Sequence, residues 1–507
     1  MHTLLIANRG EIAVRIIRAA RELGLRTVAV YSEVDYEAPH AQLADAAFCL
    51  GPPEPAQSYL DSARLLEIAR RSGADAVHPG YGFLAENAAF AEDCRGAGLL
   101  YVGPTPEAIR LMGSKILSKQ LAASAGVPVV PSYHAPDMAT LARQAPAMAD
   151  RFGYPVLVKA SAGGGGKGMR VVEQADDLLA ALEAGAREAQ QAFGDGTLLL
   201  EKYLHRPRHI EVQILGDHAG QRLHLFEREC SIQRRHQKII EESPSPAVDA
   251  ALRQRLTSAA LRLAEAVHYT NAGTVEFLLD PEGNFYFLEM NTRLQVEHPI
   301  TECVTGIDLV QAQLRIARGE PLGYTQSEVS QRGHAIECRL YAEDPAQHFL
   351  PATGRIRVLR EPHGPGRRID SGIALQQEIT PYYDPILAKL VCSGATRQEA
   401  ILRMQALLAD YTLLGVTTNR QFLLDVLRSE AFAAGTTDTD FLRRHFPAWQ
   451  PASHISDEML AVAALGDWLQ RQGQFGEPLS AGRSAPAARL APSPWQRYDG
   501  WRLGGQR

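Results

Sequence analysis

Paired cysteines, long apolar runs and a basic excess are all missing from this chain of 507 residues. The six cysteines include no C-x-x-C pair, which excludes the usual zinc sites and disulfide frameworks and suits a reducing compartment. No apolar run reaches membrane-spanning length, and the net charge of −6 argues against a nucleic-acid partner. A strand pattern begins at once after Met1, so we expect no targeting peptide. These absences predict a soluble cytoplasmic protein that binds neither membranes nor nucleic acids.

Lysine is also scarce. Only seven of the 52 basic residues are lysines, so each is a candidate for a site that needs a compact ammonium group rather than a planar guanidinium. Six of the seven lie between residues 115 and 238, and chance clustering explains one lysine better than it explains the group. They are Lys115, Lys119, Lys159, Lys167, Lys202, Lys238 and Lys389.

The first 115 residues alternate short apolar strands with helical patterns. Strands are expected at 4–7, 27–31 and 76–78, with helices at 11–23 and 62–71, which predicts an open parallel α/β sheet. The first turn carries a single glycine, so the dinucleotide-binding fingerprint is missing there. The loop 78–87 is rich in glycine and aromatic residues and follows a strand, where such sheets bind ligands. A purely structural turn is the alternative for that loop.

A glycine-rich loop follows the strand expected at 155–160. Gly163, Gly165 and Gly168 have the G-x-G-x-x-G spacing, but a second strand follows instead of a helix, so the Rossmann context fails. Walker A fails as well, because Lys167 is followed by glycine and not by Ser or Thr. The segment predicts a hairpin cover whose bare amides approach phosphate oxygens. A plain flexible loop is the alternative.

The segment from Thr274 to His298 carries the most specific chemistry. Two apolar runs flank a turn at 280–284, and centring a hairpin on that turn places Glu276 opposite Glu289. Two carboxylates at roughly 5 Å and an effective dielectric of about 20 repel by ~3 kcal/mol. A cation between them is therefore expected, and oxygen ligands from Glu276, Glu289 and Asn291 suit Mg²⁺ or Mn²⁺. A charged, solvated edge strand is the alternative.

Further polar residues surround this hairpin in the sequence. If its second strand stays extended, alternation places Glu289, Asn291, Arg293, Gln295 and Glu297 on one face, together with Leu278 and Phe287. Residues 201–204 have the features of a hinge that presents backbone groups and Glu201 to a purine edge. Between 230 and 238 four cationic or titratable side chains are clustered, which in an acidic chain favours anion binding inside a cleft over a nucleic-acid patch.

Together these motifs resemble biotin carboxylase of the ATP-grasp superfamily, from Ile6 to about Phe446. The motifs are Lys115, Lys159, the glycine loop 163–168, residues 201–204, His209, Q-x-x-H-x-K at 233–238, Glu276, E-M-N-T-R-x-Q-V-E-H at 289–298, H-A-I-E-C-R at 334–339 and Y-Y-D-P at 382–385. The resemblance implies an α/β protein, α+β in its C-terminal part. An ATP-grasp fold is preceded in it by a Rossmann-like open parallel-sheet domain.

The resemblance also implies a division into four parts. Residues 1–115 would form the N-terminal domain, and 116–330 the ATP-grasp domain, whose lid spans about 131–203. Residues 331–446 would form the C-terminal domain. Residues 447–507 would hold a helix at 457–472, a Gly/Pro/Ser-rich linker and the start of a subunit-interaction domain. The tail after about 473 is expected to be disordered or loosely docked.

The implied reaction is ATP-dependent carboxylation of biotin by bicarbonate through carboxyphosphate. Glu297 would deprotonate bicarbonate, and Arg339 would stabilise the biotin enolate. The ATP ligands would be Lys115, Lys159, Gly165, Gly166, Glu201, Lys202, Leu204, His209, Gln233, His236 and Leu278. Bicarbonate and biotin would contact Lys238, Arg293, Gln295, Val296 through its amide, Tyr81 and Arg339, with Arg293, Glu297, Arg339 and Lys238 as the catalytic set. The metal ligands would again be Glu276, Glu289 and Asn291.

No Met-Lys-Met biotin-attachment triplet is present, so biotin would be carried by another chain or domain. The tail resembles the linker of an acyl-CoA carboxylase α chain such as that of 3-methylcrotonyl-CoA carboxylase. The implied partners are a carboxyltransferase β subunit, in a homodimer or an α/β hetero-oligomer. The sequence leaves the acyl-CoA open among 3-methylcrotonyl-, propionyl-, acetyl- and geranyl-CoA. Another ATP-grasp ligase and a non-catalytic assembly subunit remain the alternatives.

Overall fold

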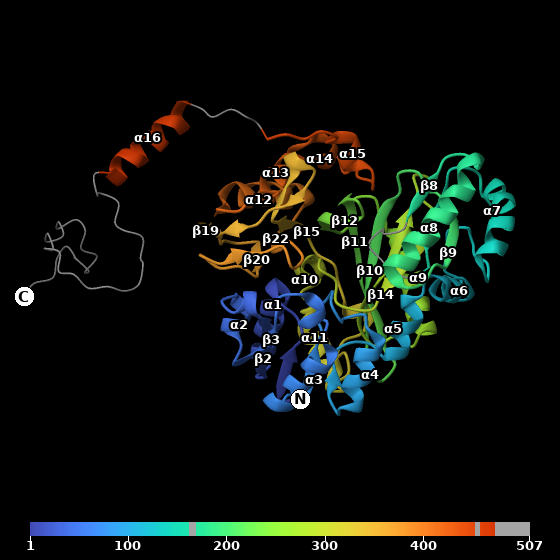
Figure 1. Cartoon of the computed structure of the whole chain (residues 1–507), viewed down its shortest axis with the longest axis horizontal. Coiled ribbons are helices and arrows are strands. Elements are labelled where there is room, and N and C mark those ends of the chain that lie inside the picture. Colours follow the sequence, from blue (N-terminus) through green and yellow to red (C-terminus); the bar gives the residue numbers. More distant parts are fainter. Residues whose placement is uncertain (162–168, 452–456, 472–507) are drawn as a thin grey trace, which may run out of the picture. The chain divides into compact units, whose positions relative to one another are not determined.

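The computed structural model describes residues 1–161, 169–451 and 457–471 (Figure 1). It divides into one unit from Met1 to Pro451 and a second from Ala452 to Arg507. The predicted glycine lid at 163–168 and the predicted disordered tail lie outside the described residues. The only described part of the second unit is helix α16, Asp457–Arg471, where the sequence predicts a helix. Its apolar residues Met459, Val462 and Trp468 are more than half exposed.

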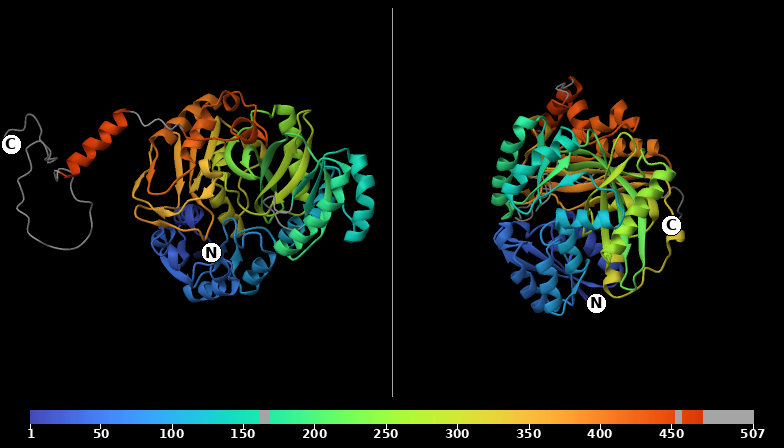
Figure 2. Two further views of the ribbon diagram at one scale, coloured as in Figure 1. Left: turned by 45° about the horizontal axis from the view of Figure 1, so that its top comes forward. Right: turned by 90° about the vertical axis from the view of Figure 1, so that its right-hand side faces the viewer.

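The chain begins with a parallel five-stranded sheet in the order β3-β2-β1-β4-β5, as the alternating pattern predicts. Its strands are Thr3–Ile6, Arg26–Ser32, Ala46–Gly51, Ala76–His78 and Leu100–Tyr101, numbered β1 to β5. Its helices are α1 Gly10–Glu22, α2 Pro39–Leu43, α3 Ser62–Ser72, α4 Ala88–Gly96 and α5 Pro106–Gly113. Figure 2 shows this part, in blue, at the bottom of both views.

A smaller antiparallel sheet follows, in the order β6-β9-β7-β8. Its strands are β6 Ser132–Tyr133, β7 Val156–Ala160, β8 Arg170–Val172 and β9 Leu198–Lys202. Helices α7 Met138–Phe152 and α8 Leu178–Phe193 pack on it. Helix α6, Lys115–Ser124, leads into this part and starts where the Ser114 side chain accepts a hydrogen bond from the Leu117 amide, a standard N-cap. The sequence-predicted strand 155–160 is thus confirmed.

The largest sheet has eight strands in the order β14-β13-β10-β11-β12-β15-β22-β20. These are β10 Arg208–Gly216, β11 Arg222–Arg234, β12 Gln237–Ser243, β13 Asn271–Leu279, β14 Phe285–Asn291, β15 His334–Tyr341, β20 Arg367–Ser371 and β22 Ile386–Gly394. Because β12 pairs with β15, one sheet runs across the border expected near residue 330. Helices α9 Ala250–Ala266, α10 His298–Thr305 and α11 Leu309–Ala317 belong to this region.

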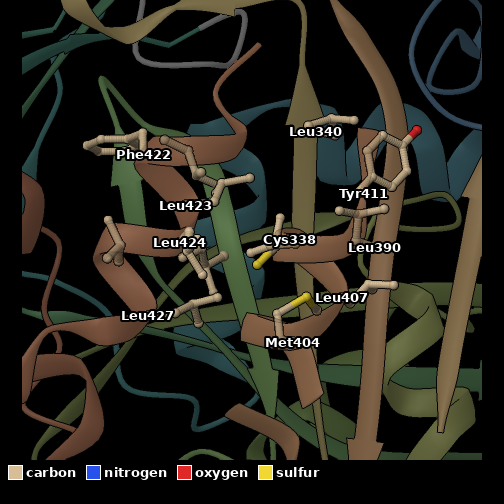
Figure 3. Close-up of a cluster of buried hydrophobic side chains, with 14 of the residues drawn as sticks. Cys338, Leu340, Leu390, Met404, Leu407, Tyr411, Phe422, Leu423, Leu424 and Leu427 are labelled. Carbon is tan, nitrogen blue, oxygen red and sulfur yellow. The ribbon is translucent and has the colours of Figure 1, made fainter. Parts of the chain in front are cut away.

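The C-terminal part of the first unit completes the sheet and covers it with helices. These are α12 Arg397–Asp410, α13 Arg420–Arg428, α14 Glu430–Ala433 and α15 Phe441–His445. Short strands form three further pairs: β16 Glu343–Asp344 with β17 Leu350–Pro351, β18 Gly354–Arg355 with β21 Glu378–Ile379, and β19 Val358–Arg360 with β23 Thr412–Leu414. Figure 3 shows the buried core between the sheet and α12 and α13, including Cys338, Leu390, Met404 and Phe422. This apolar core provides a rigid base for the polar residues on β15 and β22.

Candidate active site

A cleft of about 1040 Å³ collects most of the side chains singled out from the sequence. It lies between β9, the β10–β14 end of the large sheet and the segments around Phe349 and Phe446. Its lining includes Lys115, Glu201, Lys202, Leu204, His209, Gln233, His236, Lys238, Glu276, Leu278, Glu289, Asn291, Arg293, Gln295, Val296 and Arg339. The structure therefore brings together residues that are more than 220 positions apart in sequence.

The carboxylate hairpin has the predicted pairing at its functional end, since Glu276 lies opposite Glu289. Nearer the turn, a register shift after Glu276 pairs Phe277 with Phe287. The prediction that Leu278 and Phe287 share the cleft face is therefore wrong. Phe287 is fully buried in the core, and Leu278 lines the cleft. The register shift therefore points Phe287 into the core and Leu278 into the cleft, as a β-bulge does by inserting one extra residue in one strand.

The second strand does not stay extended, because β14 ends at Asn291. The expected alternation through Arg293 to Glu297 is thus wrong, and Glu297 is instead the N-cap residue of α10. Convergence is achieved by hydrogen bonds: Gln295 Nε2 donates to Glu276 Oε1 at 2.9 Å. Arg293 Nη2 donates to Asn291 Oδ1 at 3.0 Å. The chain turns, yet the polar groups still meet at the hairpin.

Lys238 lies at the centre of a carboxylate cluster. Its Nζ donates to Glu211 Oε2 at 2.5 Å, Glu276 Oε1 at 2.8 Å and Glu297 Oε1 at 2.7 Å. Burial disfavours the charged amine, but the three carboxylates outweigh burial and raise the pKa of Lys238 well above its usual value. Arg228 is fully buried beneath them, with Nε 2.5 Å from Glu211 Oε1. The two cations let several carboxylates stay ionised in a buried site.

Glu297 is held from two sides. Arg339 Nη2 donates to Glu297 Oε2 at 2.9 Å, while Lys238 occupies the other oxygen. Although burial favours the neutral acid, these cations hold the pKa of Glu297 well below its usual range. Arg339 is oriented in turn by Glu241, whose Oε1 lies 2.6 Å from Arg339 Nε. Glu297 is therefore an ionised, oriented carboxylate, which is the form that a proton acceptor requires.

A second cluster has the opposite composition. Lys159 Nζ lies 2.7 Å from Glu201 Oε2, Lys119 contacts the other oxygen of Glu201, and Lys115 Nζ lies 3.3 Å from the Ala160 carbonyl. Burial first, then the charge of Lys115, lowers the pKa of Lys159 to about 7. Burial also lowers the pKa of Lys115. An anionic ligand would relieve this crowding of ammonium groups.

The hairpin carboxylates fit a divalent cation. Burial first, and the charge of Glu276 next, raise the pKa of Glu289, so a cation bound beside this pair would favour the ionised form of Glu289. Asn291 donates its amide to Glu276 Oε1 at 2.8 Å, which leaves its carbonyl oxygen turned towards Arg293. Two carboxylates and an amide oxygen are hard ligands of the type that Mg²⁺ or Mn²⁺ takes. Lys238, 2.8 Å from Glu276 Oε1, already neutralises part of this pair.

Some predicted residues lie elsewhere. Gly165 and Gly166 fall outside the described residues. Tyr81 is not part of the cleft lining, and its hydroxyl donates to Glu11 of α1. Lys159 and Glu297 are buried at 4% and 0% exposure directly behind lining residues.

Sequence reasoning missed several residues that organise the site. Glu211 and Glu241 brace Lys238 and Arg339, and Glu86 Oε2 accepts from Arg293 Nε at 3.0 Å. Lys119, which the scarcity of lysine marks as a candidate, shares Glu201 with Lys159. Glu211 carried a signal, because His209, Glu211 and Gln213 alternate with apolar residues along β10. Glu86 lies in the loop 78–87, which the sequence marks as a candidate ligand loop, but no local pattern shows that it contacts Arg293 from more than 200 residues away.

Comparison with known proteins assigns this arrangement to a class of ATP-dependent ligases. The sequence matches "Biotin carboxylase, N-terminal domain" over residues 1–109. It matches "Carbamoyl-phosphate synthase L chain, ATP binding domain" over 114–325 and "Biotin carboxylase C-terminal domain" over 337–444. The chain belongs to the biotin carboxylase family. Its α/β fold is the ATP-grasp architecture preceded by a parallel-sheet domain, as the motifs predict.

Individual relatives agree with that assignment. A pyruvate carboxylase subunit of Methanothermobacter thermautotrophicus is 52% identical over 87% of this chain and 89% of its own length. The mitochondrial methylcrotonoyl-CoA carboxylase α chain of Rattus norvegicus is 48% identical over 91% of this chain and 65% of its own length. The biotin carboxylase domain dimer of the Hydrogenobacter thermophilus 2-oxoglutarate carboxylase, solved with MgADP and bicarbonate, has a TM-score of 0.85 at 44% identity, covering 89% of this chain and 99% of its own. No helix among the described residues is both long and apolar enough to cross a membrane.

Proposed function

We propose that this chain carboxylates biotin with ATP and bicarbonate, as the biotin carboxylase component of an acyl-CoA carboxylase. The observation that carries the proposal is the ionised carboxylate of Glu297, fixed between Lys238 and Arg339 beside a metal-type hairpin and a lysine cluster. Activation of bicarbonate as a nucleophile requires a general base and a site that holds the phosphates of ATP.

On the phosphate side, Lys115 and Lys159 bind the anionic chain of ATP. Divalent cations held by Glu276, Glu289 and Asn291 supply charge neutralisation at the transferring phosphate. The purine end lies against Leu204 and Leu278, with Glu201, Lys202, His209, Gln233 and His236 as polar partners. Gly165 and Gly166 are proposed to close over the phosphates through their amides.

On the bicarbonate side, Arg293 provides the forked donor that a planar anion needs. Glu86 and Asn291 orient it, with Asn291 Oδ1 at 3.0 Å from its Nη2. Lys238, Gln295 and the Val296 amide complete the anion site. Glu297 takes the bicarbonate proton, and the oxygen so exposed attacks the γ-phosphorus. The bond from that phosphorus to the β,γ-bridging oxygen breaks, which gives carboxyphosphate and ADP.

On the biotin side, carboxyphosphate splits into carbon dioxide and phosphate, and that phosphate removes the ureido proton of biotin. Arg339 stabilises the resulting enolate, which attacks the carbon dioxide. Glu241, at 2.6 Å from Arg339 Nε, keeps the guanidinium in place during that step. The products are ADP, phosphate and carboxybiotin. The biotin is carried on another chain or domain, because the 507 residues contain no Met-Lys-Met triplet.

The α chain of an acyl-CoA carboxylase is favoured by how far relatives align. The mitochondrial methylcrotonoyl-CoA carboxylase α chain of Dictyostelium discoideum aligns over 502 residues, 99% of this chain. The pyruvate carboxylase relative aligns over 443 residues. Since the longer alignment includes the tail, we favour 3-methylcrotonyl-CoA as the final acceptor, and the expected partner is a carboxyltransferase β subunit. A homodimer is proposed from the dimeric structural neighbour.

The test is ADP release measured with bicarbonate and free biotin supplied separately and together. The proposal expects release that depends on both, in the presence of Mg²⁺. Release that requires bicarbonate and a purine precursor but not biotin would indicate another ATP-grasp ligase instead. No turnover by a folded, ATP-binding protein would indicate a non-catalytic role in assembly.

The acyl acceptor needs a second experiment. Co-purification from the native source, followed by mass spectrometry, should recover a carboxyltransferase that uses an acyl-CoA. Recovery of a partner that carboxylates pyruvate or 2-oxoglutarate would replace the acyl-CoA assignment with a 2-oxo acid carboxylase.

A further inference from the structure

Lys389 is the single lysine that lies outside the cluster between residues 115 and 238, and the proposed chemistry leaves it unused. It lies on β22 with 0% exposure, where an ammonium group needs acceptors. Its Nζ donates to the Val296 carbonyl at 3.0 Å. It also lies 3.1 Å from Glu11 Oε2 and 4.0 Å from Asp370 Oδ2. One of its three partners is thus the backbone of a cleft residue.

The bonded carbonyl belongs to the peptide that joins Val296 to Glu297. Val296 lines the cleft, and Glu297 starts α10 as its N-cap residue. A hydrogen bond to this carbonyl fixes the plane of that peptide, and with it the direction in which the Glu297 side chain leaves the backbone. Lys389 does not line the cleft itself, so any effect on the reaction passes through Val296.

The other side of Lys389 is braced by the N-terminal domain. Glu11 lies in the first turn of α1 and is 2% exposed, and it accepts the hydroxyl of Tyr81. The Tyr81 ring centroid lies 5.8 Å from Lys389 Nζ. Helix α1 packs against β20 and β22 (Figure 1). A Cβ at Gly372 would lie 2.3 Å from the Glu11 amide nitrogen, so this close approach requires glycine.

We propose that Lys389 is a positioning residue that, braced by Glu11, orients the Val296–Glu297 peptide for bicarbonate activation. The proposal rests on the proposed function and adds a residue to it. It also gives Tyr81 a supporting place behind the cleft. A purely structural role, in which Lys389 only neutralises Glu11 and Asp370, is the competing explanation.

Three variants separate the two explanations. Lys389→Met removes the donor to Val296, and Lys389→Arg keeps a donor. The double variant Lys389→Met/Glu11→Gln removes the donor together with the buried charge that it neutralised. Because burial already raises the pKa of Glu11 to about 7, the single variant Lys389→Met leaves an acid that protonates readily, which favours a folded protein.

The positioning role predicts a specific kinetic pattern with free biotin. Lys389→Met and the double variant should lose about 10- to 100-fold in kcat/KM for bicarbonate, the scale for a misplaced reacting group. KM for ATP should stay within about two-fold, and Lys389→Arg should recover most of the loss. Thermal stability should return in the double variant while bicarbonate use does not.

A double variant that regains both stability and bicarbonate use would overturn the proposal, because only charge neutralisation would then matter. So would a folded Lys389→Met with unchanged kinetics. Arg253→Met is the matched control, because it removes the cation 2.7 Å from the buried Glu227. Among the described residues, no hydrogen bond or ion pair joins Arg253 to Val296. It should lose stability and keep its bicarbonate kinetics. A parent protein without biotin-dependent turnover would instead refute the proposed function.

Discussion

Two clusters of buried charge face the same cleft, and their compositions are inverted. Around Lys238, one ammonium is shared by Glu211, Glu276 and Glu297. Around Glu201, one carboxylate is shared by Lys119 and Lys159, with Lys115 nearby. In the first cluster the neighbouring cations keep Glu297 ionised. In the second, burial first and the charge of Lys115 next lower the pKa of Lys159 to about 7.

The difference shows how one cleft can treat two anions in opposite ways. The lysine-rich cluster holds more ammonium groups than carboxylates, so a bound polyphosphate would balance its charge. In the carboxylate-rich cluster, Lys238, Arg339 and the buried Arg228 keep the carboxylate of Glu297 ionised, so a proton acceptor is present. Under the proposed function, bicarbonate placed between them would meet a base on one side and an electrophilic phosphate on the other.

The largest effect is expected at Glu297. Glu297→Gln keeps the shape of the side chain but removes the proton acceptor, so bicarbonate-dependent turnover should fall by about 100-fold or more. ATP and Mg²⁺ binding should persist in calorimetry. Glu242→Gln is the matched control, since Glu242 is buried against Arg397 and His334 outside the cleft. Activity of the Glu297 variant within a few-fold of the parent would remove this residue from the role of base.

The second prediction concerns proton uptake by the lysine cluster when ATP binds. With a pKa of about 7, Lys159 is mostly neutral at pH 8, and a bound phosphate chain raises that pKa. ATP binding at pH 8 should therefore take up protons, measurable by calorimetry in buffers of different ionisation enthalpy. Lys159→Met should abolish part of this uptake and weaken ATP binding about ten-fold. Binding without proton uptake in the parent would contradict the charge imbalance assigned to this cluster.

A smaller effect is expected at the metal hairpin. Burial raises the pKa of Glu289 above that of the unfolded chain, so its stabilising contribution exists at low pH and is lost as pH rises through the folded value. At neutral pH, Glu289→Gln should raise the metal-free free energy of unfolding by up to about 1 kcal/mol while weakening Mg²⁺ binding. Denaturant titrations with and without Mg²⁺ measure both. A large loss of metal-free stability would make Glu289 structural.

The smallest effect concerns the tail. Trp449 donates to Asp425 at 2.9 Å and packs on Phe422, so the segment up to Pro451 belongs to the catalytic unit. Deleting residues 452–507 should leave carboxylation of free biotin within about two-fold, while a deletion from 447 should also lower the melting temperature. Loss of free-biotin activity in the shorter deletion would assign the tail a catalytic role.

Much of the fold was predictable because its signals are local. The alternation of strands and helices before residue 115 predicts the parallel sheet, and the turn at 280–284 predicts that Glu276 faces Glu289. The register shift beside Phe277 was not predictable, because a bulge depends on which side chains the core accepts. The end of β14 at Asn291 was not predictable either, because an alternating polar pattern fits a strand and a turn equally well.

In the candidate site, too, local features were predictable and long-range contacts were not. Residues within a motif, such as Arg293 and Glu297, follow from the sequence. Their supports do not, because Glu86, Glu241 and Lys389 reach the site from other strands and loops. Only the packing of the sheets shows that Lys389 contacts the Val296 carbonyl.

The most direct measurement follows the oxygen atoms of bicarbonate. If Glu297 activates bicarbonate to attack the γ-phosphorus, turnover of ¹⁸O-labelled bicarbonate with ATP, Mg²⁺ and free biotin should place one labelled oxygen in each phosphate released. Mass spectrometry of the phosphate gives the answer. Phosphate whose new oxygen comes only from water would contradict bicarbonate attack and the pairing of the two charge clusters on which it depends.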